Sequence, residues 1–269
     1  MKWIISKVKL FACCLNLHKP DIEILNVSFW RRCSSFKRSH FHYRRSQMAA
    51  NSGANLPDAE QKQVDAVLQF WFAPAHRALW FRSTPEFDAA IRAQFLALHE
   101  RAAGSECDVW ADAGAVSAVA LCVLLDQFPR NMFRSTARAF ATDAKGEQVA
   151  RRALERGFDA ALSDGSALSA YRLAHEAASG GGGGGGEALD GGSMLHFLLM
   201  PLMHSERLET QELSVQKFAA TGQQTHAFAV LHRDVIKRFG RFPGRNKAIG
   251  RESTAEELAW LESPEGKHF

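Results

Sequence analysis

Two loops of the sequence place arginine and asparagine after a Phe-Pro pair. The first reads QFPRN and contains Arg130 and Asn131, and the second reads RFPGRN and contains Arg241, Arg245 and Asn246. Guanidinium groups and side-chain amides held on stiff loops suit the binding of a carboxylate or a phosphate. Each loop follows an apolar segment, so its proline should end a helix and leave the polar side chains available. We expect the two loops to meet in space as one polar cluster.

Two histidines are candidates for acid–base chemistry. His232 falls within the apolar stripe of the segment THAFAVLHRDVIKRF, and His204 opens the phrase HSE, which ends at Glu206. At about 100° per residue both imidazoles face the interior, if the helix that follows His204 already includes it. An interior imidazole is either a structural group bonded to a carbonyl or to a carboxylate such as Asp126, which is the commoner case, or an acid–base catalyst. The sequence leaves both interpretations open.

A metal site is not expected at these positions. His-x-Glu and His-x-Asp pairs on a helix diverge by about 200°, so neither pair can bind one ion. The arginines have a structural alternative as well, which is to pair with Asp126, Glu206 and Asp234 where helices end. We predict no metal and no cofactor, with His204 and His232 as catalytic candidates. The predicted ligand-binding residues are Asp126, Arg130, Asn131, Glu206, Arg241, Arg245 and Asn246.

The elements that must position these groups are helices. From residue 57 onward apolar residues recur with a period of about 3.6, and no alternating run bounded by turns interrupts them. The segment AVSAVALCVLLDQF is apolar nearly all round, which predicts a central helix that Pro129 ends. We expect an all-α domain over residues 57–269, built from about seven helices in antiparallel pairs.

Two stretches do not fit this pattern. Residues 1–56 form a basic leader with many Arg and Ser residues, which we expect to be disordered. The leader is either an organelle transit segment or an artefact upstream of Met48. We therefore expect an organellar location, in mitochondrion or plastid, if the leader is real, and a cytoplasmic one otherwise. The glycine run within residues 163–193 predicts a disordered insertion, because glycine offers no side chain to pack.

Composition excludes several classes of function. Residues 1–47 carry ten Lys and Arg against two acidic residues, so the remaining chain is net acidic although the whole carries +4. An acidic body argues against a nucleic-acid partner, which needs a basic face. No apolar segment is long enough to span a membrane. Five cysteines, three of them in the leader, do not indicate a disulfide framework.

Several long phrases resemble a known family. The phrases VLQFWF, LLDQFPRNMFRSTARAFATD, PLMHSERLETQE and LHRDVIKRFGRFPGRN, followed by IGREST, are similar to the mainly bacterial family called domain of unknown function 924. The resemblance covers residues 64–269 apart from the glycine insertion. It implies an all-α, TPR-like right-handed helical stack and no established activity, substrate or cofactor. The chain departs from the family where HFLLMP precedes the HSE phrase after the insertion.

Two functions are compatible with these residues. The first is a TPR-like binding module that recognises a protein segment or a small anionic ligand on a concave face. The second is an enzyme that acts on an anionic metabolite, with histidine as acid–base and arginines as an anion clamp. The sequence alone does not choose between them.

Overall fold

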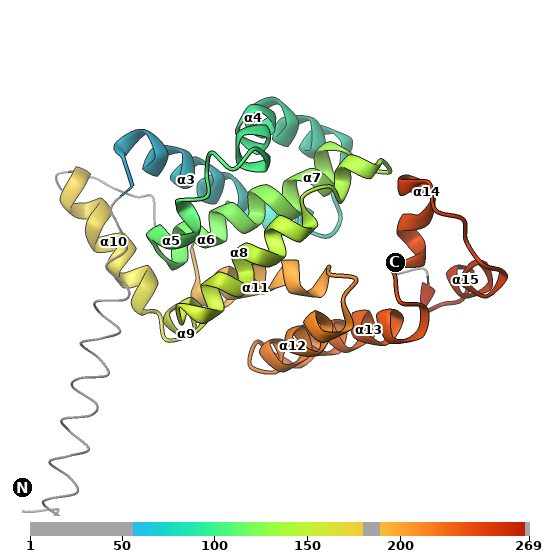
Figure 1. Cartoon of the computed structure of the whole chain (residues 1–269). Helices are drawn as coiled ribbons and strands as arrows, with labels where there is room; N and C mark the ends of the chain where they lie inside the picture. Colours follow the sequence, from blue (N-terminus) through green and yellow to red (C-terminus); the bar gives the residue numbers. More distant parts are fainter. Residues whose placement is uncertain (1–55, 180–188, 267–269) are drawn as a thin grey trace, which may run out of the picture. The chain divides into compact units, whose positions relative to one another are not determined.

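The computed structural model describes residues 56–179 and 189–266, which form an all-α fold (Figure 1). Thirteen α-helices and no strand occur within these ranges, so the predicted fold class is confirmed. The helix count exceeds the expected seven because six of the helices have eight residues or fewer. The right-handed, TPR-like stacking stays a prediction. Among the described residues, no helix is both long and apolar enough to cross a membrane.

Seven helices have eleven residues or more, and the others are short. The long helices are α3 (Asp58–Trp71), α4 (Pro85–Ala103), α8 (Asp143–Glu155), α10 (Ser166–Ser179), α11 (Gly191–Met203), α12 (Leu208–Phe218) and α13 (Gln223–Phe239). The short helices are α5 (Trp110–Ala113), α6 (Ala115–Cys122), α7 (Phe128–Met132), α9 (Phe158–Ser163), α14 (Asn246–Ile249) and α15 (Ala255–Leu261). Three 3-10 turns are η1 (Pro74–Leu79), η3 (Ala137–Ala139) and η4 (Pro243–Arg245).

The predicted disordered insertion at 163–193 is wrong over most of its N-terminal half. Residues 166–179 form α10, where Tyr171 and His175 bond to Asp65 of α3 at 2.8 Å each. These hydrogen bonds hold α10 against α3, although the glycine-rich stretch next to α10 led us to expect disorder there. Residues 180–188, which hold the glycine run, and the leader up to residue 55 lie outside the described part of the chain.

Helix α6 is the centre of the fold, as its all-apolar sequence predicts. All eight of its residues are buried, and it packs against α3, α5, α8, α9, α10 and α11. Leu121 at its end, and Leu124 and Leu125 in the next turn, are fully buried. Burying one such side chain stabilises a fold by about 1.5–3 kcal/mol. This apolar packing fixes the position of the polar residues that follow α6 in the chain.

Pro129 does not end this helix, contrary to the prediction. The chain passes from α6 through a π-helical turn, η2 (Val123–Gln127), directly into α7, and Pro129 lies in the first turn of α7. A π-helical turn can accommodate a proline because it relocates the hydrogen bond that the ring nitrogen cannot make.

Side chains replace the backbone donors that this turn loses. The carbonyl of Leu124 receives a hydrogen bond from the ring of His99, and that of Leu125 receives one from the hydroxyl of Thr142. The carbonyl of Asp126 receives one from Arg130 Nη1 at 2.6 Å. Three consecutive carbonyls therefore accept hydrogen bonds from side chains, two of which come from other elements and one, Arg130, from α7.

We expect Thr142→Val to destabilise the fold by about 1–3 kcal/mol, because it leaves the buried carbonyl of Leu125 without its donor. The matched control is Thr136→Val, which removes a hydroxyl bonded to Phe133 in an exposed residue and should change stability by less than about 0.5 kcal/mol. Urea unfolding of both variants measures the difference. Equal midpoints for the two would show that the π-helical turn does not need the Thr142 hydroxyl.

Candidate functional site

The two Phe-Pro segments meet on one carboxylate, although the first lies in helix α7 and is not the loop that the sequence predicted. Arg130, from the first segment, binds both oxygens of Asp143 at 2.9 Å, and Arg245, from the second, binds Asp143 Oδ2 at 2.9 Å. The guanidinium of Arg245 also lies over the rings of Phe140 and Phe242, at 4.8 and 4.5 Å from their centroids. Burial lowers the pKa of Arg245 to about 10, so it stays charged at neutral pH. Two segments more than a hundred residues apart therefore share one ion-pair network.

His204 and Asp126 form the innermost pair of the site. Asp126 lies in the π-helical turn η2 and is fully buried, and His204 Nδ1 is 2.8 and 2.9 Å from its two carboxylate oxygens. His204 is the C-cap of α11, directly after Met203, and does not belong to the next helix. The sequence had left open a place for His204 in that next helix. Its carbonyl oxygen accepts a hydrogen bond from Arg245 Nη2 at 2.8 Å. The end of α11 is thus held by the same arginine that binds Asp143.

The protonation states of this pair follow from its surroundings. Burial alone would raise the pKa of Asp126, but the charges of Arg130 and His204 and the hydrogen bonds from His204 and Gln127 lower it to about 2. Burial, followed by the charge of Arg130, lowers the pKa of His204. At pH 7 an anionic Asp126 therefore faces a neutral His204. Because an ionised carboxylate only accepts, the single proton of the imidazole is on Nδ1.

The second nitrogen of His204, Nε2, then carries a lone pair. No hydrogen bond from the described residues reaches this atom, and the side chain is 12% exposed. The ring of His232 lies nearby, with its centroid 6.2 Å from that of His204. Burial, followed by the charge of His204, lowers the pKa of His232 to about 3. Both predicted catalytic histidines therefore lie together, and both are neutral at pH 7.

Glu206 completes the network from the other side. Its two carboxylate oxygens bind Arg251 at 2.7 and 2.9 Å, and one of them accepts the backbone N–H of Phe242 at 2.8 Å. We call the whole group the junction cluster; it consists of Asp126, Arg130, Asp143, His204, Glu206, Arg245 and Arg251. Three arginines are matched by three carboxylates, and the histidine is neutral. The junction cluster therefore carries no net charge.

Three of the predicted ligand-binding residues lie outside the junction cluster. Asn131 donates to Asp88 Oδ1 at 2.7 Å, because it leaves α7 on the side that faces α4. Arg241 binds both oxygens of Glu257, and Asn246 donates to the same carboxylate at 3.2 Å. Glu257 also forms the capping box of α15. These three residues anchor helix ends. The structural alternative named Asp126 among the arginine partners, and Arg130 does bind it at 3.1 Å, whereas Arg241 and Arg245 bind other acids.

Two members of the junction cluster were missed in the sequence. Asp143 opens α8 directly after Thr142, where a carboxylate is favoured by the helix dipole. Arg251 belongs to the phrase IGREST after the second loop, and it also donates to Asn246 Oδ1 at 2.8 Å. The position of Asp143 at a helix start and that of Arg251 within the phrase IGREST were signals that the sequence did offer. Which acid pairs with which arginine was not readable, because it depends on how the helices cross.

The junction cluster lies where two apolar clusters meet. The main core contains α6, α11 and Phe218 of α12, whereas Val235, Ile236 and Phe242 form a separate small cluster with Phe239 and Trp260. Polar contacts, from Arg245 to Asp143 and from Glu206 to Arg251 and Phe242, connect the chain after Gly240 to the main core. Figure 1 shows this C-terminal segment in red, with α14 and α15 following α13.

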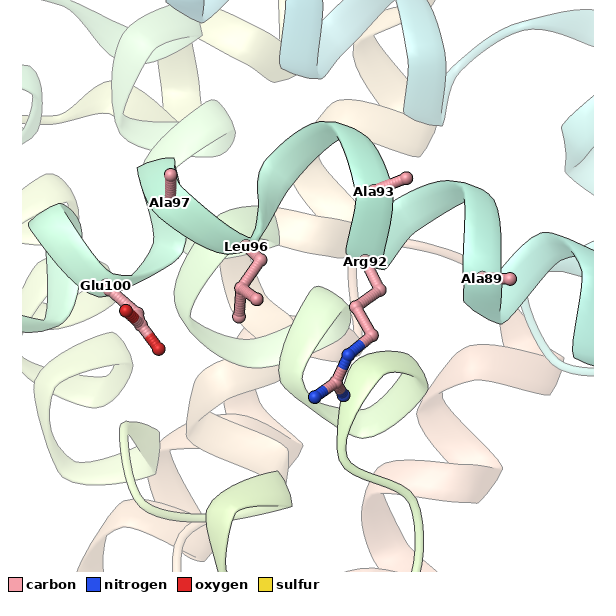
Figure 2. Close-up of a pocket in the computed structure, with 6 residues that line it drawn as sticks. All are labelled: Ala89, Arg92, Ala93, Leu96, Ala97 and Glu100. Carbon is pink, nitrogen blue, oxygen red and sulfur yellow. The ribbon is translucent and has the colours of Figure 1, made fainter.

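A hollow of about 570 Å³ lies elsewhere, along the outer face of α4. Figure 2 shows the residues that line it, which are Ala89, Arg92, Ala93, Leu96, Ala97 and Glu100. All six come from one helix, and none belongs to the junction cluster. The hollow therefore contains no acid–base pair, and the junction cluster is the better candidate for a functional site. Over the described residues, no three His, Cys, Asp or Glu side chains converge as metal ligands.

We expect Asp143→Asn to destabilise the protein by about 3 kcal/mol, because two largely buried guanidinium groups lose their shared carboxylate. Glu256→Gln is the matched control: it removes an exposed partner of Arg238 and should cost no more than about 0.5 kcal/mol. Urea unfolding at pH 7 measures both. A loss for Asp143→Asn as small as that of the control would show that Arg130 and Arg245 do not depend on this carboxylate.

We expect stability to fall as the pH drops from about 6.5 toward 4, because unfolded histidines bind protons there while the buried ones do not. The pKa of His232 is about 3 and that of His196 about 4 in the folded protein, against about 6.5 when unfolded. His232 alone should contribute at most about 2 kcal/mol of this loss between pH 7 and 5. His232→Gln should therefore show a shallower pH dependence in urea unfolding, and an unchanged one would contradict the burial of a neutral imidazole.

Comparisons with known proteins agree with this architecture. Residues 67–265 match the model of a family described as a bacterial protein of unknown function, DUF924. A solved structure of a protein of unknown function from Agrobacterium tumefaciens is 33% identical, with a TM-score of 0.60, covering 74% of this chain and 96% of that chain. No curated protein matches the chain. The chain belongs to the DUF924 family.

Proposed function

We propose that this protein is an acid–base enzyme in which His204 is the general base and Asp126 is the residue that positions it. One observation supports this above the others: Nδ1 of His204 is bound to a fully buried, ionised carboxylate, while Nε2 has no partner among the described residues. A carboxylate behind an imidazole fixes the reactive tautomer and stabilises the imidazolium that forms during proton transfer. A purely structural histidine would gain from bonding both nitrogens.

The pair suits the activation of water. Ser205, the neighbouring hydroxyl, is buried and accepts the backbone N–H of Arg207, so it is not placed as a nucleophile for His204. In our proposal Nε2 takes a proton from water while the water oxygen forms a bond to the carbonyl carbon of an ester or amide. Nε2 then gives that proton to the leaving group as its bond to carbon breaks. Asp126 stays ionised throughout, because its pKa is about 2.

The competing proposal, a module that binds an anionic ligand, has less support. It needs cations without partners, whereas Arg130, Arg245 and Arg251 are each paired with a carboxylate. A ligand carboxylate would have to displace Asp143 or Glu206 from those contacts. The net neutrality of the junction cluster therefore favours an uncharged substrate group near His204.

We expect the protein to hydrolyse p-nitrophenyl acetate, and His204→Gln to lower kcat/KM by about 100-fold or more, the usual contribution of a general base. Asp126→Asn should lower it as well, because an amide no longer enforces the tautomer with Nε2 unprotonated. The activity should rise with pH and reach half its plateau below about pH 6.5, since the pKa of His204 is lowered.

His226→Gln provides the matched control, because this half-buried histidine of α13 lies outside the junction cluster. It should keep the full rate. Circular dichroism of each variant separates lost chemistry from lost folding. Equal rates for His204→Gln and the unmodified protein would refute the proposed role of His204.

A further inference from the structure

Helix α13 leaves two large apolar side chains exposed. Phe228 is 43% exposed and Leu231 is 41% exposed, whereas Val235 on the same face is buried in the small C-terminal cluster. At about 100° per residue these residues and His232 lie within one stripe of the helix. The C-terminal part of the stripe is therefore covered by the small C-terminal cluster, whereas its N-terminal part is exposed to solvent. A single exposed leucine would need no explanation, but two large apolar side chains exposed side by side on one helix face do.

The open half of this stripe begins beside the proposed catalytic pair. His232 Nδ1 bonds to the carbonyl of Phe228 at 2.8 Å, and the His232 ring lies 6.2 Å from that of His204 and 5.7 Å from that of Phe242. One helical turn, about 5.4 Å along the axis, separates His232 from Phe228. A group attached to a carbonyl near His204 Nε2 would thus pass His232 and reach the exposed pair.

The charges around this path favour an uncharged chain. The junction cluster is balanced internally, and His204 and His232 are neutral at pH 7. Between Phe228 and Val235 the side chains of the stripe are apolar apart from His232. Burying a chain of methylene groups on the stripe is favourable. A charged or strongly polar chain would lose its hydration there and find no hydrogen-bond partner.

We propose that Phe228 and Leu231 bind the apolar chain of the substrate, and that the substrate class is neutral acyl compounds of medium chain length. This proposal rests on the proposed function, because it places the acyl carbonyl at His204. It adds a specificity site on α13 that is separate from the junction cluster. Each methylene group fully buried on the stripe should improve binding by about fourfold.

The binding test uses octanamide, an uncharged amide with an eight-carbon chain, and the full-length protein. Equilibrium dialysis should show saturable binding of octanamide, and acetamide should bind at least tenfold more weakly. The double variant Phe228→Ser with Leu231→Ser should lose at least tenfold in octanamide affinity. Leu258→Ser is the matched control, because Leu258 is 54% exposed on α15, and it should bind as the unmodified protein does. Absence of binding, or equal loss in the control, would overturn the proposal.

Chemical labelling then decides where the chain lies. Diethyl pyrocarbonate reacts with an unprotonated imidazole nitrogen, and mass spectrometry of peptides reports the labelling of His204. Octanamide at saturation should slow this labelling at least fivefold in the unmodified protein, but not in the double variant at the same concentration. Octanamide that binds without protecting His204 would place the chain elsewhere and would overturn the proposal.

A series of p-nitrophenyl esters separates this proposal from the proposed function. The value of kcat/KM should rise about tenfold or more from the butanoate to the octanoate, and the double variant should flatten that rise. If His204→Gln hydrolyses esters normally while octanamide still binds and protects His204, the catalytic role fails and the binding site stands. A flat series with normal acetate hydrolysis would overturn the binding site alone.

Discussion

The buried carboxylate of Asp126 is the constraint on which the site depends. Removing an ionised group from water costs several kcal/mol unless partners compensate it. Here Arg130, His204 and Gln127 provide the compensation, and no part of Asp126 is exposed. His204 comes from the end of α11, far along the chain, so α11 must end beside η2 if the charge is to be tolerated. The position of one acid therefore fixes the relation between two distant elements.

The π-helical turn explains how a charged group came to lie in the central helix. Regular α-helix through Pro129 would lose one hydrogen bond and meet a clash of the proline ring. The π-helical turn accommodates the proline, and the side chains of Thr142, His99 and Arg130 donate to its carbonyls. Departures of this type are frequent at functional sites, because they direct side chains where a regular helix would not. The same local irregularity thus organises both the fold and the proposed chemistry.

The sequence was informative about residue types and uninformative about partners. The apolar period predicted the helices and the central place of α6, and the bond of an interior histidine to Asp126 was one of the alternatives it offered. It did not show that Glu206 binds Arg251, or that Asn131 turns toward α4, because these pairings depend on how helices cross. The condition that the helix after His204 already includes it was not met, because His204 directly follows the last residue of α11, Met203.

The way the C-terminal segment is attached bears on how a substrate could reach His204. Apolar packing joins α13 to α12, but after Gly240 the attachment to the main core depends on ion pairs and on the backbone contact between Phe242 and Glu206. For largely buried ion pairs such as Arg245 with Asp143, the cost of removing both charges from water offsets much of their attraction, so the pairs add little net free energy. Local opening there would cost less than opening the apolar core. In our proposal a substrate therefore reaches His204 from the side of His232, while the bond between His204 and Asp126 stays in place.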